Sequence, residues 1–203
     1  MIPRRWSRPG SGDQAAGDQA AAHPHAPAEL DEATQWALKA QDGDPIAQAA
    51  FVRLTQAEVW RFTAALVDPA SADDLTQETY LRAFRALPTF AARSTVRTWL
   101  LGIARRACAD HLRTVVRRRR LDERLAQLGT PDSVGDTAGQ LAAVDLLRGL
   151  TDERRTAFAL TQVIGLSYAE AAVIEGVPIG TIRSRVARAR DDLVAAHAQA
   201  IAG

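Results

Sequence analysis

Apolar residues recur at helical spacing along most of the chain. After residue 29 they return every three or four positions, which is the period of one face of an α-helix. Three successive groups are Leu30, Ala33, Ala37 and Leu38; Ile46, Ala49, Ala50, Val52 and Leu54; and Val59, Trp60, Phe62, Ala65 and Leu66. No segment sustains the alternation of apolar and polar residues that marks a half-buried strand. The pattern therefore predicts an all-α fold.

Two more helices are predicted before the middle of the chain. Ser71-Ala-Asp-Asp74 has the spacing of a capping box, which predicts a helix that begins there and ends before Pro88. A further apolar stripe predicts a helix from Thr95 to about Arg113. Trp99 lies on this stripe, so we expect it in the core rather than on a binding surface.

Composition divides the chain into parts. Residues 1–28 contain almost no large apolar side chain beyond the first few positions and are expected to be a disordered tail. Residues 121–140 are rich in Gly, Ser, Asp and Thr, as a loop is. We therefore expect two small helical domains joined by a flexible linker. The expected parts are a tail at 1–28, a domain at 29–114, the linker at 115–140, a second domain at 141–198 and a tail at 199–203.

The second domain carries the signals of a helix-turn-helix. Helices are expected at 141–150 and from Thr151 to Gly165. After these, Ser167-Tyr-Ala-Glu170 forms a capping box, and Gly176-Val-Pro178 marks a tight turn before an Arg-rich helix. One face of this last helix is apolar and must pack on the core: Ile179, Ile182, Val186, Ala189 and Leu193. The opposite face has Thr181, Ser184, Ala187 and Arg188, flanked by Arg183 and Arg185. Such a face can enter the major groove of DNA.

Charge is distributed unevenly beneath a formal net charge of only +1. Residues 29–81 carry −7, residues 82–124 carry +9, residues 125–182 carry −4 and residues 183–190 carry +4. Two basic segments separated by acidic ones are typical of a protein that binds polyanions in two places. The near-neutral sum also predicts weak DNA binding by the free protein.

The sequence offers little for catalysis or metal binding. A lone cysteine, Cys108, forms no disulfide within the chain and no Cys-based zinc site, and we expect it to be buried. The histidines lack the i, i+4 spacing of a helical metal pair. With no nucleophile–base pair and no glycine-rich phosphate loop, we predict neither catalytic residues nor a metal or cofactor. No signal peptide or bilayer-spanning apolar run is present, so we expect a cytoplasmic protein without membrane insertion.

Two motifs of the first domain point to a family. Asp73-Asp-Leu-Thr-Gln-Glu-Thr-Tyr-Leu-Arg-Ala-Phe84 is followed by a second motif, Phe90-Ala-Ala-Arg-Ser-Thr-Val-Arg-Thr-Trp-Leu-Leu-Gly-Ile-Ala-Arg-Arg-Ala-Cys-Ala-Asp-His-Leu-Arg113. This segment resembles region 2 of the extracytoplasmic-function class of bacterial RNA polymerase sigma factors, and the helix-turn-helix resembles their region 4. The resemblance covers about residues 29–198, with both regions in the family's order.

The resemblance implies partners and site residues. Core RNA polymerase would be bound through the clamp helices of its largest subunit and through its flap region. The residues expected to contact the clamp helices are Asp73, Asp74, Gln77, Glu78, Leu81 and Arg82. The promoter −10 element, with one flipped-out base, would be held by Ala86, Phe90, Arg93, Ser94, Thr95, Arg97, Arg106 and Arg113. The −35 element would be read by Thr181, Arg183, Ser184, Arg185, Ala187 and Arg188. An anti-sigma factor is a further candidate partner.

The sequence departs from the family pattern at the expected base pocket. Family members often have Phe-Arg-Gly-Glu/Asp-Ser where this chain has Phe90-Ala-Ala-Arg-Ser94, and often Asn in place of Arg106. The base captured at the −10 element therefore stays undefined. The linker is long enough for its task, because residues 114–140 span at most about 90–97 Å, whereas a spacer of roughly 17 base pairs covers about 58 Å.

Two other functions are compatible with parts of the sequence. A dimeric repressor or activator could combine the helix-turn-helix with an N-terminal helical sensor, but residues 73–113 would then have no role. A nucleotide-using or metal enzyme with an attached helix-turn-helix would need a site that the sequence lacks. We therefore predict a sigma factor that is not itself an enzyme.

Overall fold

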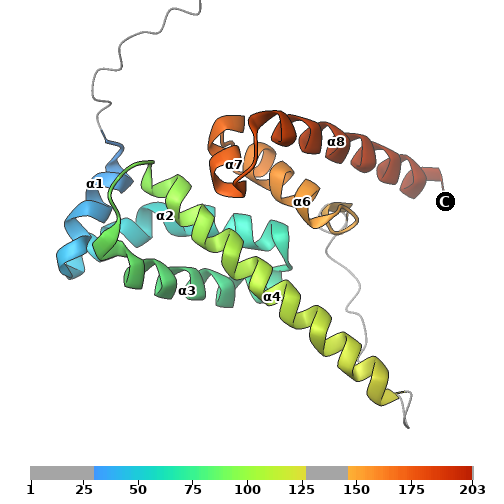
Figure 1. Ribbon diagram of the computed structural model, residues 1–203, viewed down its shortest axis with the longest axis horizontal. Helices are drawn as coiled ribbons and strands as arrows, with labels where there is room; N and C mark the ends of the chain where they lie inside the picture. The colour runs from blue at the N-terminus through green and yellow to red at the C-terminus, as the bar shows by residue number, and fades with distance from the viewer. Residues whose placement is uncertain (1–29, 127–145, 203) are drawn as a thin grey trace, which may run out of the picture.

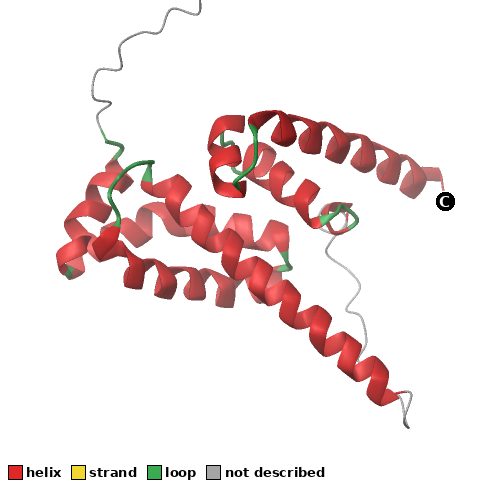
Figure 2. Cartoon of the chain, viewed as in Figure 1, coloured by secondary structure: helices red, strands yellow, loops and turns green. Residues whose placement is uncertain are grey.

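The computed structural model describes residues 30–126 and 146–202. All regular elements in these ranges are helical (Figure 1; Figure 2), which confirms the all-α prediction. The α-helices are α1 (Glu32–Lys39), α2 (Pro45–Leu66), α3 (Pro69–Ala86), α4 (Val96–Ala126), α6 (Asp152–Phe158), α7 (Tyr168–Glu175) and α8 (Ile179–Ala202). Shorter helical turns are η1 (Ala40–Asp42), η2 (Leu87–Thr89) and η3 (Ala159–Val163). The expected N-terminal tail and most of the expected linker lie outside the described residues. None of the described helices combines the length and apolarity needed to cross a membrane.

Helices α1 to α4 form the first module, a bundle around one apolar core. The largest fully buried side chains from this bundle include Phe51, Phe62, Leu87, Leu100 and Leu101. Phe51 packs edge-to-face on Tyr80, with ring centroids 5.9 Å apart. The Tyr80 hydroxyl lies 2.6 Å from Thr55 Oγ1, and burial raises the pKa of Tyr80 to about 12. The tyrosine is thus neutral and serves the core.

Helix α3 begins earlier than the sequence pattern indicates. The expected capping box at Ser71 is wrong, because the helix starts at Pro69 and its N-cap is Asp68. The Asp68 carboxylate accepts a hydrogen bond from the Ser71 backbone N–H at 2.8 Å. Proline suits the first helical turn, since it has no N–H that needs a partner there. Ser71 itself therefore lies inside the helix.

Helix α4 continues well past its expected end near Arg113 and runs through Ala126. Arginine is a good helix former, so the run Arg117–Arg120 extends the helix instead of ending it. The start of the expected linker, from residue 115, is therefore helical. Its 31 residues give α4 a length of about 46 Å, and its C-terminal part projects beyond the rest of the bundle (Figure 1).

The second module confirms the expected helix-turn-helix. The Ser167 hydroxyl accepts a bond from the Glu170 backbone N–H, and the Glu170 side chain accepts one from the Ser167 backbone N–H. Helix α7 ends at Gly176, which adopts the left-handed conformation (φ +65°) that favours glycine. Helix α8 follows after Pro178 and packs on α6 and α7. Of the helix expected at 141–150, residues up to 145 lie outside the described ranges.

The two modules pack against each other. Leu160 and Ile164 of the second module belong to the same buried cluster as Phe51 of the first. Arg97 on α4 donates from Nη2 to the Ile164 carbonyl at 2.6 Å and from Nε to the Glu58 carboxylate on α2 at 2.8 Å. Helix α2 contacts η3, and α4 contacts α7, so the second module lies along α2 and α4 (Figure 1).

A buried arginine of the second module, Arg155, also contacts the first module. Arg155 is 9% exposed and donates to four backbone carbonyls at 2.9–3.0 Å. Three belong to the segment before α6, at Leu147, Arg148 and Leu150, and the fourth is Leu66 at the end of α2. Burial lowers the pKa of Arg155, but these carbonyls replace the water that the cation loses.

Removing the Arg155 guanidinium should destabilise the fold. Arg155→Met leaves buried carbonyls without a donor, and we expect a loss of about 3 kcal/mol in the free energy of unfolding. Urea titration monitored by circular dichroism measures it. Arg154→Met is the matched control, because the Arg154–Asp192 ion pair is 31% and 41% exposed and should contribute less than about 1 kcal/mol. Equal losses for the two variants would contradict the role given to Arg155.

Candidate protein and nucleic-acid interfaces

The outward face of α3 is acidic and partly apolar. Asp73, Asp74 and Gln77 are exposed, and Leu81 leaves 55% of its surface open to solvent. Trp60 of α2 extends this face, because its indole N–H donates to Asp73 Oδ1 at 2.9 Å while the side chain stays 39% exposed. Sequence reasoning missed Trp60, since it shares an apolar stripe with core residues. Tryptophan is enriched at protein interfaces, so an exposed one marks a candidate interface here.

Two residues expected on this face are used in internal contacts. Arg82 donates from Nε to Glu78 and from Nη1 to Asp110 of α4, each at 2.7 Å. The hydrogen bond from Arg82 holds the pKa of Asp110 below its ordinary value, and Arg113 adds a second. Glu78 and Arg82 thus link α3 to α4, and both remain about one third to two fifths exposed.

The loop before α4 and the side of that helix present several of the expected −10 residues. Arg93, Thr95 and Arg106 are exposed, and Ala86 and Ser94 are half-buried. The loop passes through Ala92, whose φ of 49° is uncommon for a residue with a side chain. Arg113 is exposed as well, although it forms an ion pair with Asp110.

Phe90 does not lie on this surface. Its side chain is 6% exposed and packs on Trp99 with ring centroids 4.9 Å apart. The Gln41 amide donates to the carbonyls of Leu87 and Phe90 at 3.0 and 2.7 Å, which fixes the chain at this point. Phe90 therefore supports the loop from beneath instead of offering its ring to a base. Trp99 is half-buried against the core, close to the position expected for it.

Arg97 is also turned inward. Its guanidinium is held by Glu58 and by the Ile164 carbonyl of the second module, so it is not free to reach a phosphate in this arrangement. Hydrogen bonding to Glu58 raises the pKa of Arg97 and keeps the cation in the interface. No local signal in the sequence indicates this contact, because its partners are 39 and 67 residues away.

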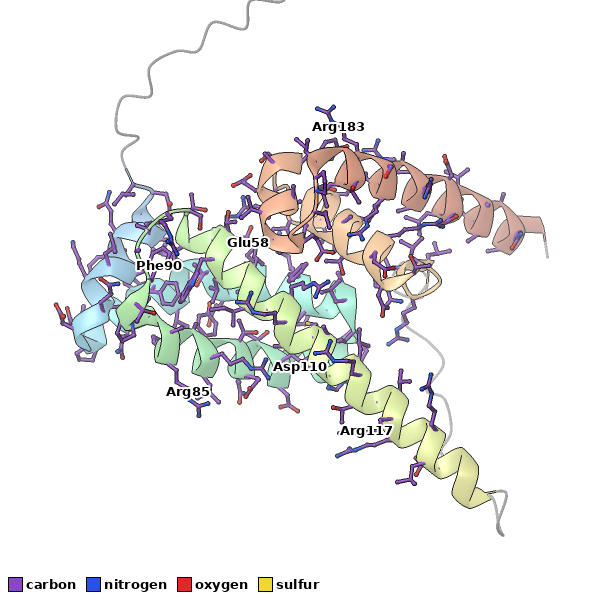
Figure 3. The ribbon with its side chains drawn as sticks, in the orientation of Figure 1. Glu58, Arg85, Phe90, Asp110, Arg117 and Arg183 are labelled. Atoms are coloured by element: carbon purple, nitrogen blue, oxygen red, sulfur yellow. The ribbon has the colours of Figure 1, made fainter. Side chains whose placement is uncertain are left out.

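The outward face of α8 is open along most of the expected −35 surface. Arg183, Ser184, Ala187 and Arg188 are exposed and Thr181 is half-buried. Figure 3 shows Arg183 projecting away from the rest of the molecule. The apolar face is confirmed at Ile182, Val186 and Ala189, which are at most 1% exposed.

Arg185 differs from its neighbours on α8. It donates to Glu175 Oε2 at 3.2 Å, and Arg105 of the first module donates to Glu175 Oε1 at 2.7 Å. The Glu175 side chain is only 1% exposed, so one buried carboxylate holds two arginines from different modules. Arg185 is thus used in an internal contact and is less available than Arg183 or Arg188.

A groove of about 940 Å³ lies where α4 passes α6. Its lining is apolar and charged. The apolar side chains include Leu66, Leu112, Val116 and Leu121, and the charged ones are Arg113, Arg117 and Arg120 of α4 with Asp152 and Glu153 of α6, besides Arg105. Cys108 also lines it, is 1% exposed, and has a pKa raised by burial to about 12. In the part of the chain that the structure describes, no group of acidic, histidine or cysteine side chains could hold a metal ion.

Comparison with protein families agrees with this geometry. The family model "Sigma-70 region 2" matches residues 50–119, and the model "Sigma-70, region 4" matches residues 140–193. The first match spans most of α2 to α4, and the second contains the helix-turn-helix. The exposed faces of α3, α4 and α8 therefore lie in the segments that these families define.

Relatives with similar sequences are ECF sigma factors as well. The ECF RNA polymerase sigma factor SigC of Mycobacterium tuberculosis is 51% identical over 173 residues, covering 81% of this chain and 91% of SigC. The ECF RNA polymerase sigma-E factor of Haemophilus influenzae is 30% identical, covering 75% and 88%.

Among solved structures, the sigma factor RpoE of Bartonella quintana in complex with the anti-sigma factor NepR is 30% identical. It covers 70% of this chain and 91% of RpoE, with a TM-score of 0.54. CnrH in complex with the cytosolic domain of CnrY shares the fold at a TM-score of 0.63 and 24% identity, covering 83% and 99% of the two chains. This chain belongs to the extracytoplasmic-function sigma factors of the sigma-70 family, with its first module as region 2 and its second as region 4.

Proposed function

We propose that region 2 binds core polymerase and opens the −10 element, while region 4 reads the −35 element. As an ECF sigma factor, the chain directs promoter-specific transcription initiation and is a non-enzymatic subunit of RNA polymerase. The observation that supports these separate roles is that the structure has three separate exposed surfaces. An acidic one lies on α3, and basic ones lie on α4 and α8. We place the action of the protein in the cytoplasm, with polymerase and chromosome.

Region 4 would place α8 in the major groove. Arg183 and Arg188 are exposed beside the small residues Ser184 and Ala187, so the helix can approach base edges closely. Arginine donates two hydrogen bonds to guanine, and each such pair discriminates against other bases. Arg185, held by Glu175, has a positioning role in this scheme.

Region 2 would hold the −10 element at the loop before α4. Arg93, Ser94 and Thr95 sit on a loop supported by the buried Phe90 ring, and Arg106 lies on the adjacent helix. Extruding a base costs a few kcal/mol, which contacts to the base and to phosphates offset. Binding energy would then drive strand opening without hydrolysis.

The clamp helices of the polymerase would dock on α3. Asp73, Asp74 and Gln77 supply acceptors and an amide, while Leu81 and Trp60 supply apolar area at the same face. Interfaces with a central aromatic or aliphatic anchor and a polar surround bind well. The −7 charge of residues 29–81 suits a basic partner surface rather than DNA.

Promoter binding would require the two regions to separate. The two promoter elements are about 58 Å apart along a spacer of roughly 17 base pairs. In the structure, α7 of region 4 contacts α4 of region 2, and Glu175 joins them through Arg105 at 2.7 Å. We propose that core polymerase, by binding both regions, holds them apart at the promoter spacing. The free protein would then bind DNA weakly.

An anti-sigma factor is the second partner that we propose. The Bartonella sigma factor that this chain resembles was solved with such a protein. The groove between α4 and α6 is lined by apolar side chains and by charged ones of both signs, which suit an amphipathic helix. A dimeric regulator is less well supported, because the α3 face and the region 2 motif have no role in it.

Loss of an arginine from the α8 face should weaken recognition of the −35 element. Arg183→Ala or Arg188→Ala removes a base or phosphate contact, and we expect a cost of about 1–3 kcal/mol in binding by the holoenzyme. Fluorescence anisotropy with promoter duplexes measures the affinity. Arg190→Ala is the matched control, since Arg190 bonds Gln162 within region 4. Unchanged affinity for both α8-face variants would refute the assigned recognition face.

Changes on the α3 face should impair assembly with the polymerase. Asp74→Ala with Gln77→Ala removes polar contacts, and we expect at least a tenfold weaker affinity for core enzyme, equal to about 1.4 kcal/mol. Native gel titration of core enzyme with labelled sigma factor measures it. Asp42→Ala with Gln48→Ala is a control away from α3. Equal assembly by both double variants would rule out this docking surface.

A further inference from the structure

The segment formed by α1 and η1 contacts the start of the loop before α4. This loop, residues 90–95, carries several of the proposed −10 residues and is called here the −10 loop. Gln41 lies in η1, and its side-chain amide donates to the carbonyls of Leu87 and Phe90, at 3.0 and 2.7 Å. One amide nitrogen makes both hydrogen bonds, which holds the chain at the start of the loop in one conformation.

The same segment also contacts the end of the −10 loop. The Val96 N–H is the first of α4 and has no partner within that helix, and Val96 is fully buried. The Thr34 hydroxyl of α1 accepts a hydrogen bond from this N–H at 2.9 Å and donates its own proton to Asp31. Asp31 also accepts from the Thr34 backbone N–H at 3.0 Å. The carboxylate thus orients the hydroxyl so that its lone pairs face Val96.

Between these two anchor points the −10 loop contains a residue in an uncommon conformation. Ala92 has a φ of 49°, in the left-handed region that residues with a side chain rarely adopt. Such a conformation costs about 1–3 kcal/mol and persists only where the surroundings hold it. The buried Phe90 ring supports the loop from beneath, and Thr34 and Gln41 hold its two ends.

We infer that Asp31, Thr34 and Gln41 are positioning residues for base selection at the −10 element, and we call them the N-terminal brace. This role rests on the proposed −10 function of the loop. A site that selects one flipped-out base must hold its groups within about 0.5 Å of the productive geometry. Thr34 is fully buried, so it acts through the loop and not on DNA. Without the brace the loop would adopt several conformations and would accept other bases.

The N-terminal brace lies outside the segment that defines region 2 in the family. That segment, residues 50–119, contains the −10 loop but neither α1 nor η1. The brace reaches the loop over 46 and 49 residues from Gln41 and over 62 residues from Thr34. The chain before the family segment therefore contributes to the recognition function of that segment.

The test measures base preference by holoenzyme reconstituted from core polymerase and full-length sigma factor. The DNA is a promoter that wild-type holoenzyme selects from a random library, with each −10 position changed in turn to the other three bases. Open-complex formation is followed by the fluorescence of 2-aminopurine placed beside the changed position. The ratio of the rates on the selected and changed promoters gives the preference at each position. Because both rates come from one protein preparation, the ratio does not depend on how much of the protein is folded.

Loss of the brace should flatten this preference. Thr34→Val with Gln41→Met removes the hydroxyl and the amide but keeps similar side-chain volumes. The ratio at the most selective position should fall about tenfold, while affinity for core enzyme should change less than twofold. Gln41→Met alone alters only a half-buried side chain and should lower the ratio in the same direction. This single variant decides the question if the double variant does not fold.

Thr79→Val with Gln35→Met is the matched control. Thr79 is also fully buried, but its hydroxyl donates to the Leu75 carbonyl of its own helix at 2.6 Å. The Gln35 amide donates to the Leu30 carbonyl at 2.7 Å, away from the −10 loop. The control thus loses the same chemical groups and should keep the wild-type ratio. An unchanged ratio with Gln41→Met, or an equal fall with the control, would overturn the inference.

The proposed −10 function has a separate readout. Arg93→Ala with Arg106→Ala removes two exposed cations, one from the −10 loop and one from α4, and should slow opening on the selected promoter. Normal opening by this variant would overturn the −10 assignment itself. Defective opening by it, together with wild-type base preference in the brace variants, would overturn the brace alone.

Discussion

The contact between regions 2 and 4 rests on a few polar anchors around an apolar centre. Arg97 links α4 to α2 through Glu58 and to region 4 through the Ile164 carbonyl. Arg155 reaches back from region 4 to the end of α2, and Glu175 bridges Arg105 and Arg185. Arg97, Arg105 and Arg185 are partly exposed and can exchange their partners for water at moderate cost, whereas Arg155 and Glu175 are buried. The interface thus holds the two regions together in the free chain, and its polar contacts allow the regions to separate.

The packing of region 4 on region 2 explains why some arginines serve the structure and others are exposed for recognition. Those that face the interface, such as Arg97 and Arg155, are paired or buried. Those on the outer faces, such as Arg106, Arg117 and Arg183, are exposed. The net charge of +1 therefore underestimates the polyanion-binding capacity of the surface. Asp73, Asp74 and Glu78 lie on α3, where a protein partner is proposed.

The sequence predicts the parts of the fold that depend on local chemistry. Helical periodicity, the Ser167–Glu170 capping box and the glycine turn at Gly176 all act within a few residues, and all are present. The start of α3 was misplaced because two candidate caps, Asp68 and Ser71, are three residues apart. The sequence pattern underestimates the length of α4, because the apolar stripe stops before the arginine run. Arginine nevertheless favours helices, so the helix continues.

The inward turn of Phe90 and Arg97 could not be predicted from the sequence. Both depend on partners far along the chain: Gln41 holds the backbone near Phe90, and Glu58 with Ile164 holds Arg97. Family resemblance places a residue on a motif, but packing decides which way its side chain points. The exposure of Trp60 could not be predicted either. An apolar stripe on a helix does not show which of its residues lies at the edge and stays open to solvent.

Region 4 packs on region 2 in the structure of the free chain, and we propose that the two regions separate when core polymerase binds both. Single-molecule energy transfer measures this change, with one dye on exposed Arg53 of α2 and the other on exposed Ala195 of α8, each replaced by cysteine in a Cys108→Ala background. We expect high transfer in the free protein and a shift to low transfer with core polymerase and promoter, since the promoter elements lie about 58 Å apart. The same transfer efficiency in the free protein and in the promoter complex would contradict this proposal.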